Sequence, residues 1–223
     1  METGGPDAPQ AAAAAERLAL LDWKRRVSAL YQAVRTSPEP PAAWTSWRAA
    51  RDDLFRNHPQ SPVPVPDRGR LAVAYYPYDP AARALAEVAA VAPVSRDVTA
   101  SDGGTYQFTR FADARFTLFG HSVTLGLYWL EGYGGGLFLP FRDATNGAGT
   151  YGGGRYLLDT VKGADLGVRE GRLVLDFNFA YNPSCAYDSR WSCPLAPPEN
   201  RLTIAVQAGE RAPGAPVEEA TDV

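Results

Sequence analysis

The sequence predicts a mainly β protein, an antiparallel β-barrel or sandwich with N-terminal helices packed on one side. Apolar residues recur at helical spacing before residue 60, whereas after Arg70 they alternate with polar residues, as strands require. Turn-forming pairs such as Asn146 and Gly147, or Glu170 and Gly171, separate the alternating segments at short intervals. Many short strands with few helices between them are typical of antiparallel sheets.

The length of 223 residues, of which 45% are hydrophobic, suffices for one large β domain. We divide the chain into a disordered N-terminal tail (1–15), a helical segment (16–60), the antiparallel β domain (61–210) and a disordered C-terminal tail (211–223). The two tails are assigned because neither has a regular apolar period.

Two helices are predicted within residues 16–60. The first covers residues 16–34, has apolar residues at three- and four-residue steps, and ends at Pro38, because proline cannot continue a helix. The second covers residues 43–55 and ends before His58 and Pro59. The apolar stripe of the first helix consists of Leu20, Trp23, Val27, Leu30 and Val34.

Strand periodicity follows Arg70, with turn residues between the segments. Residues 80–92 stay undecided, because Asp79 and Pro80 offer a helix start before good helix formers, although a tertiary context could make part of this segment a strand. The predicted strands are residues 71–76, 105–111, 115–119, 123–130, 137–141, 155–158, 172–179 and 202–207.

Charge and hydropathy exclude several classes of partner. The net charge is −3 and no basic cluster occurs, which argues against nucleic acid and anionic membranes. No segment reaches the roughly 20 apolar residues of a transmembrane helix, and the first residues carry acids where a signal peptide needs bases. We therefore expect a cytoplasmic protein with reduced cysteines. The oligomeric state stays open.

Metal and cofactor motifs are also lacking. Cys185 and Cys193 are eight positions apart and distant in sequence from His58 and His121, which does not fit a structural zinc site, so we predict no metal. The glycine-rich residues 150–155 lack the lysine and the following helix of a phosphate-binding loop. The sequence identifies no cofactor.

A polar site is predicted where the motifs at 150–155 and 176–200 meet. Alternate residues of a strand share a face, so Asp176 and Asn178 should point the same way, and the proline-rich loop after them should close over the end of the sheet. The candidate ligand-binding residues are Tyr151, Arg155, Asp176, Asn178, Tyr181 and Asn182. The simpler alternative is that these side chains face water or tie the fold together.

Three functions fit this prediction. The first is a small-molecule-binding β domain, in which Arg155 holds an anionic group while Asp176 and Asn178 orient the ligand. The second is a hydrolase-like enzyme using Asp176 as general base or Cys185 as nucleophile, although the sequence identifies no catalytic set. The third is a structural or interaction protein without a ligand.

Two contacts are predicted for the site. Arg155 and Asp176 should both be partly buried and be linked directly or through one neighbour. Cys185 and Cys193 should lie close in space, because Asp188 and Ser189 between them favour a turn. We expect the two cysteines, with Asn200, to be structural rather than catalytic.

Several motifs resemble the bacterial and archaeal family called domain of unknown function 1684. The resemblance runs from about Trp23 to Glu210, and it implies no activity, substrate or cofactor. It favours a strand over a helix at residues 80–92. The motifs are Phe141-x-Asp143-x-Thr145-Asn146-Gly147, Thr150-Tyr151-Gly152-Gly153-Gly154-Arg155-Tyr156-Leu157, Leu175-Asp176-Phe177-Asn178-x-Ala180-Tyr181-Asn182-Pro183-x-Cys185-Ala186-Tyr187, Cys193-Pro194-x-x-Pro197-x-Glu199-Asn200-x-Leu202 and Ala208-Gly209-Glu210.

Overall fold

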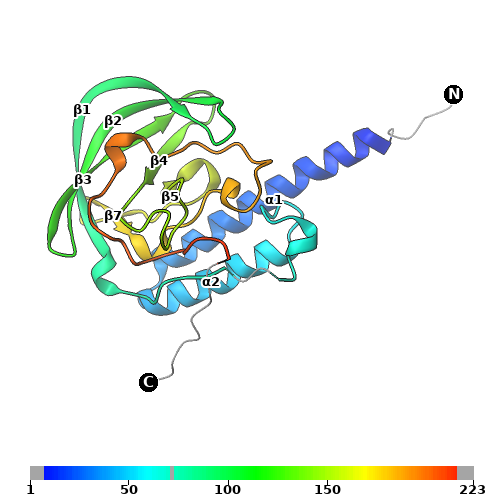
Figure 1. The fold of residues 1–223 in the computed structure, drawn as a ribbon, viewed down its shortest axis with the longest axis horizontal. Coiled ribbons are helices and arrows are strands. Elements are labelled where there is room, and N and C mark those ends of the chain that lie inside the picture. Colours follow the sequence, from blue (N-terminus) through cyan, green and yellow to red (C-terminus); the bar gives the residue numbers. More distant parts are fainter. Residues whose placement is uncertain (1–7, 71–72, 215–223) are drawn as a thin grey trace.

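Two helices lie along one side of a curved antiparallel sheet (Figure 1). The computed structural model describes residues 8–70 and 73–214. Helix α1 (Ala8–Thr36) packs against α2 (Pro40–Asn57), and the N-terminal end of α1 projects beyond the rest of the molecule. Of the predicted apolar stripe, Trp23, Val27, Leu30 and Val34 pack against the core, whereas Leu20 is 44% exposed.

Helix α1 begins earlier than predicted. Residues 8–15, predicted as part of a disordered tail, instead extend the helix, because alanine has the highest helix propensity and residues 11–15 are all alanine. The remainder of that tail, residues 1–7, and most of the predicted C-terminal tail, 215–223, lie outside the described residues.

Removing residues 1–15 is expected to change the melting temperature by less than about 2 °C. The side chains of residues 9–15 are exposed or only partly buried, so their loss should cost under roughly 0.5 kcal/mol. Differential scanning calorimetry measures this. Trp23→Ala is the matched positive control, because Trp23 stacks on Phe55 at 6.2 Å and its truncation should lower the melting temperature by several degrees. A large drop on removing the tail would show that it is docked.

The described residues contain one seven-stranded sheet in the order β5-β4-β3-β2-β1-β7-β6, with every neighbouring pair antiparallel. The protein is therefore mixed α/β, and the antiparallel part of the prediction is confirmed. The strands are β1 (Arg83–Thr99), β2 (Thr105–Leu118), β3 (His121–Leu130), β4 (Gly136–Phe141), β5 (Arg155–Asp159), β6 (Val168–Arg169) and β7 (Arg172–Asp176).

The sheet is open, so the predicted closed barrel is wrong, and a single sheet replaces the two sheets of a sandwich. The first residues of β1, Arg83 to Ala86, pair with β7, whereas the rest of the strand pairs with β2. The edge strands do not meet, because the free side of β5 is taken by a bridge from Tyr156 to Tyr181, and β6 is only two residues long. Short or covered edges also protect a sheet from pairing with other chains.

Residues 80–92 illustrate how tertiary packing overrides local helix propensity. The predicted helix start survives only as a 3₁₀ turn, Pro80–Ala82, in which Asp79 accepts a hydrogen bond from the Ala81 amide. The chain then becomes β1, in which Ala84 and Ala86 are buried on one face. Small side chains at alternate positions let β1 pack closely against the core, which a helix would not allow.

Other strands differ from prediction in their bounds. The predicted strands 105–111 and 115–119 form one strand, β2, which is irregular between Arg110 and Ala112. The predicted strand 172–179 ends at Asp176 and continues as a 3₁₀ turn, Phe177–Phe179. Residues 202–207 are not a strand. Of the predicted strand 71–76, residues 71–72 lie outside the described ranges, and Tyr75 forms an isolated bridge to Glu210.

The C-terminal segment 196–211, called here the strap, runs from the sheet to the helices and is the orange-to-red segment in Figure 1. At its start, the Asn200 side chain accepts from the Gly126 amide at 2.8 Å and donates to the Pro140 carbonyl at 2.8 Å, which fixes it to β3 and β4. Near its end, Gly209 has φ +76° and passes so close to Ala180 that a Cβ would lie 2.5 Å from its carbonyl oxygen. Only glycine fits there.

Candidate functional site

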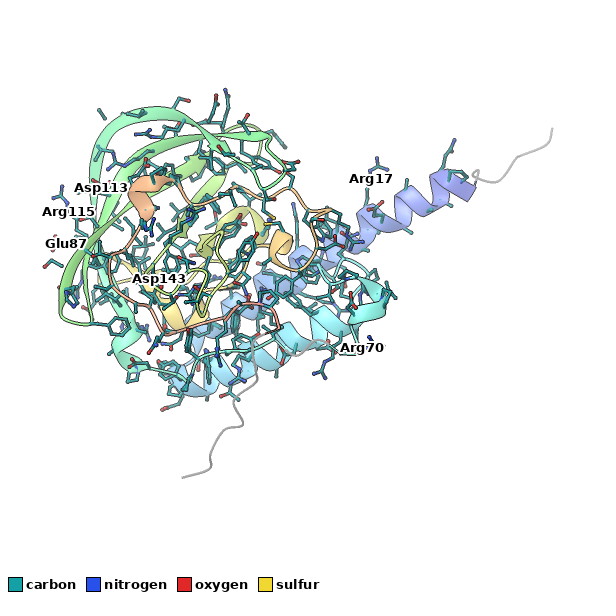
Figure 2. The ribbon with its side chains drawn as sticks, in the orientation of Figure 1. Arg17, Arg70, Glu87, Asp113, Arg115 and Asp143 are labelled. Atoms are coloured by element: carbon teal, nitrogen blue, oxygen red, sulfur yellow. The ribbon has the colours of Figure 1, made fainter. Side chains whose placement is uncertain are left out.

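Arg155 is completely buried, and its side chain binds the backbone of the strap. Its guanidinium lies 2.8 Å from Asp143 and donates to the backbone carbonyls of Val206 at 2.9 Å, Ala208 and Glu210. Asp143 is itself buried and accepts from the Thr145 amide at 2.7 Å. Figure 2 shows Asp143 inside the molecule, whereas the labelled Arg17 and Arg70 point outward. All of these hydrogen-bonding partners of the Arg155 guanidinium belong to the protein itself, so Arg155 does not act as a ligand-binding residue here.

A second buried ion pair joins the strap to α2. Glu210 is completely buried and accepts from the Arg51 guanidinium, from the Asn182 amide at 2.7 Å and from the Tyr187 hydroxyl at 3.0 Å. The Arg51 guanidinium also lies 4.8 Å from the centre of the Tyr181 ring. Tyr181 and Asn182 line a cavity of about 50 Å³, well below the roughly 300–1,000 Å³ of typical small-molecule sites.

Asp176 and Asn178 do not lie on one strand face as predicted, but their side chains contact each other. Because the strand ends at Asp176, the Asn178 side chain folds back and donates to the Asp176 carboxylate at 2.9 Å. The same amide group bonds both backbone groups of Asp79, at 2.8 and 2.9 Å. Trp44 of α2 donates to the Asn178 carbonyl at 3.0 Å. Asn178 is therefore a junction between α2, the turn before β1 and β7.

The predicted link between Arg155 and Asp176 is wrong. Both side chains are buried, but within the described part of the chain no hydrogen bond or ion pair joins them and they share no hydrogen-bonding partner. Arg83 is instead the cation beside Asp176, with its Nε 4.0 Å from the carboxylate. Burial raises the pKa of Asp176, and its hydrogen bonds from Asn178 and the charge of Arg83 only partly offset this.

A cleft of about 530 Å³ opens between the helices and the β7 edge of the sheet. Arg35 from the end of α1, Arg83 from β1 and Arg169 from β6 line it, together with Asp176. We call it the arginine cleft. Its remaining walls are largely apolar, and they include Val34, Pro38, Ala43, Leu166, Val174 and Phe179.

Of the six residues predicted to bind a ligand, only Asp176 lines the arginine cleft. Tyr151 lies elsewhere, with its hydroxyl 3.7 Å from the Cys185 sulfur, so the six side chains do not converge on one cavity. Sequence reasoning missed Arg35, Arg83 and Arg169, which come from three separate elements. It also missed the ion-pair partners Asp143 and Glu210, although both lie in the motifs quoted above.

The two cysteines are neighbours, as predicted. The Cys185 amide donates to the Cys193 sulfur at 3.3 Å, and both thiols are free. Within residues 8–70 and 73–214, no three His, Cys, Asp or Glu side chains are grouped so that they could hold a metal ion. In the same ranges, no helix combines the length and apolarity needed to cross a membrane.

These features define a class of protein: an open, seven-stranded antiparallel sheet that carries two helices on one side and is closed by a C-terminal strap. The model of the family described as "Protein of unknown function (DUF1684)" matches residues 71–211, and the chain belongs to this family. The match covers the whole sheet and the strap.

A solved structure supports the same fold. The chain is similar to an uncharacterized protein of Haloarcula marismortui, solved by solution NMR, with 38% sequence identity and a TM-score of 0.56. The similarity covers 76% of this chain and 92% of the archaeal one. A comparison with curated proteins finds no match.

Proposed function

We propose that this protein binds a small anionic metabolite in the arginine cleft. The observation that carries the proposal is the gathering of three arginines, Arg35, Arg83 and Arg169, around one cavity of about 530 Å³ that holds a single carboxylate. This volume lies within the range of about 300–1,000 Å³ that is typical of small-molecule sites. The location expected from the sequence is cytoplasmic, so the ligand would be a soluble metabolite.

The charges in the cleft favour an anion. Asp176 lies 4.0 Å from Arg83, which leaves most of the hydrogen-bonding capacity of that guanidinium open, and the Arg83 side chain is 28% exposed. Arg169 is exposed and has no ion-pair partner among the described residues. Arg35 is held beside the cleft by the carbonyl of Asp165 at 2.6 Å and forms a partly exposed ion pair with the Asp165 carboxylate at 3.4 Å, so Arg83 and Arg169 carry most of the charge open to a ligand. A guanidinium can bind a carboxylate or a phosphate through two parallel hydrogen bonds.

The apolar walls suit the carbon skeleton of such a ligand. Val34, Leu166, Val174 and Phe179 line the cleft between the helical layer and the sheet. Ligand sites combine walls of this kind with a few polar groups that fix orientation. A carboxylate or phosphate ester with a short hydrocarbon part fits both features.

A thermal-shift screen with carboxylates and phosphate esters at about 150 mM salt tests the proposal. A ligand at 100 times its Kd should stabilise the protein by about 2.7 kcal/mol. Arg169→Gln should weaken binding at least tenfold in isothermal titration calorimetry, since it removes a charge from the cleft. Arg172→Gln is the matched control, because Arg172 pairs with Arg169 across β6 and β7 but does not line the cleft.

Two results would contradict the proposal. One is a screen in which no anion raises the melting temperature. The other is an equal loss of affinity in Arg172→Gln and Arg169→Gln, which would indicate attraction to the overall charge of this edge and not to the cleft.

A hydrolase-like reaction is the second candidate, favoured by one observation. Asp176 lines the cleft, and its burial raises the pKa of the carboxyl toward the range in which a general acid or base works. In that case Asp176→Asn should abolish turnover of a bound ester while calorimetry still detects binding. Turnover that survives this substitution would leave Asp176 with a structural role alone.

A further inference from the structure

The loop 184–195 holds its two cysteines in unequal environments. Cys185 lies in a 3₁₀ turn, Ser184–Ala186, and is partly exposed, whereas Cys193 is 2% exposed. The Cys185 amide donates to the Cys193 sulfur at 3.3 Å, so the second sulfur lies directly against the backbone of the first cysteine. Cys185 is thus partly exposed to solvent, whereas Cys193 is buried directly beside it.

Hydrogen bonds on both sides fix this loop to the rest of the protein. Ser101 donates from its amide to the Cys193 carbonyl at 2.9 Å and accepts from the Cys193 amide at 3.1 Å through its hydroxyl. The Trp191 indole donates to the Pro62 carbonyl at 3.2 Å, and the Leu195 amide donates to Thr99 at 2.9 Å. These hydrogen bonds fix Cys193 in place, and the bond from the Cys185 amide to the Cys193 sulfur keeps Cys185 beside it.

Polar groups around Cys185 favour its thiolate form. The Tyr151 hydroxyl lies 3.7 Å from the Cys185 sulfur. Hydrogen bonding from the Cys193 thiol, in first place, and from Ser101 and Tyr151 lowers the pKa of Cys185 to about 6, although its partial burial acts against this. The same hydrogen bond and burial raise the pKa of Cys193. A thiolate is the form of cysteine that attacks electrophiles.

We propose that Cys185 and Cys193 form a peroxide-reactive pair, in which Cys185 is the attacking cysteine and Cys193 the resolving one. The pair lies apart from the arginine cleft, since neither cysteine, nor Tyr151, nor Ser101 lines it. The proposal therefore does not depend on ligand binding in that cleft.

The reaction has two steps. The Cys185 thiolate attacks one oxygen of hydrogen peroxide, the O–O bond breaks, and the departing hydroxide takes up a proton to become water, which leaves Cys185 as a sulfenic acid. The Cys193 sulfur then attacks the Cys185 sulfur, the S–O bond breaks, and the thiol proton leaves with the hydroxyl as a second water. Two thiols are oxidised by two electrons to one disulfide, and one peroxide is reduced to two waters. A dithiol reductant reverses the change by exchange.

Mass spectrometry of the reduced full-length protein treated with hydrogen peroxide tests the proposal. The wild type should lose two hydrogens and become resistant to alkylation at both cysteines. Cys193→Ser should stop at the sulfenic acid, which a cyclic 1,3-diketone traps as an adduct on Cys185. Cys185→Ser should react at least tenfold more slowly than the wild type, because only the buried thiol remains.

The pH dependence of alkylation provides a readout on the unmodified chain. Iodoacetamide should label Cys185 with a midpoint near pH 6, and Tyr151→Phe should move this midpoint upward, because one hydrogen bond to the thiolate is lost. A midpoint above pH 8 in the wild type would overturn the proposal. So would an oxidised product in which the two cysteines are not joined, or equal peroxide reactivity in Cys185→Ser and the wild type.

Discussion

Replacing Asp143 by alanine is expected to lower the free energy of unfolding by about 3–5 kcal/mol, because it leaves the fully buried Arg155 without a counter-charge. The loss should be this large since both partners are shielded from water and neither can turn outward to be hydrated. Equilibrium denaturation in urea, followed by circular dichroism, measures the change.

The control for Asp143→Ala is Glu170→Ala, which removes an ion pair of the same type from the surface. Glu170 and Arg172 lie 2.9 Å apart with both side chains largely exposed, so this loss should stay below about 1 kcal/mol. In an Arg155→Met background, Asp143→Ala should lower the free energy of unfolding far less than in the wild type, because no buried guanidinium is then left without a counter-charge. Equal losses in Asp143→Ala and Glu170→Ala would show that the buried pair does not hold the strap.

Glu210→Ala is the second substitution expected to have a large effect, again about 3–5 kcal/mol, or roughly 10 °C in melting temperature for a chain of this size. It leaves the Arg51 guanidinium among aromatic rings without a carboxylate. It also removes the acceptor for the Asn182 amide and the Tyr187 hydroxyl. Thermal unfolding followed by near-ultraviolet circular dichroism reports both the stability and the packing of the nearby tyrosines.

Glu199→Ala is the matched control for Glu210→Ala, since Glu199 lies in the same strap and also accepts from a tyrosine hydroxyl, that of Tyr128 at 2.8 Å. Its side chain is 32% exposed, and its ion pair with Arg96 is at the surface. We expect a loss of about 1 kcal/mol. If Glu199→Ala proved as costly as Glu210→Ala, burial of the ion pair would not be what stabilises the strap.

Local patterns in the sequence predicted the helices and most strands of this fold. The stripe of Trp23, Val27, Leu30 and Val34 specifies its own helix, because the spacing alone decides which face is buried. Residues 80–92 show the limit of such patterns. Alanine suits both a helix and a closely packed strand, and only the neighbours β2 and β7, distant in sequence, decide between them.

For the site too, features set by local sequence could be predicted, whereas contacts between segments distant in sequence could not. The proximity of Cys185 and Cys193 follows from a turn between them and was predicted correctly. The partner of Arg155 was not, because several carboxylates could balance its charge and the sequence does not order them by distance. The arginine cleft could not be anticipated at all, since Arg35 and Arg83 meet only after the helices dock on the sheet.

The strap sets the order in which this chain can fold as it leaves the ribosome. Glu210 follows Arg155 by 55 residues and Arg51 by 159 residues. At roughly 5–20 residues per second, translation leaves Arg155 without its carbonyl partners for about 3–10 s. During that interval the Arg155 guanidinium lacks the carbonyl groups of Val206, Ala208 and Glu210 that accept its hydrogen bonds in the native structure. The native state therefore becomes accessible only after the strap has been synthesised, even where the helices and hairpins have already formed.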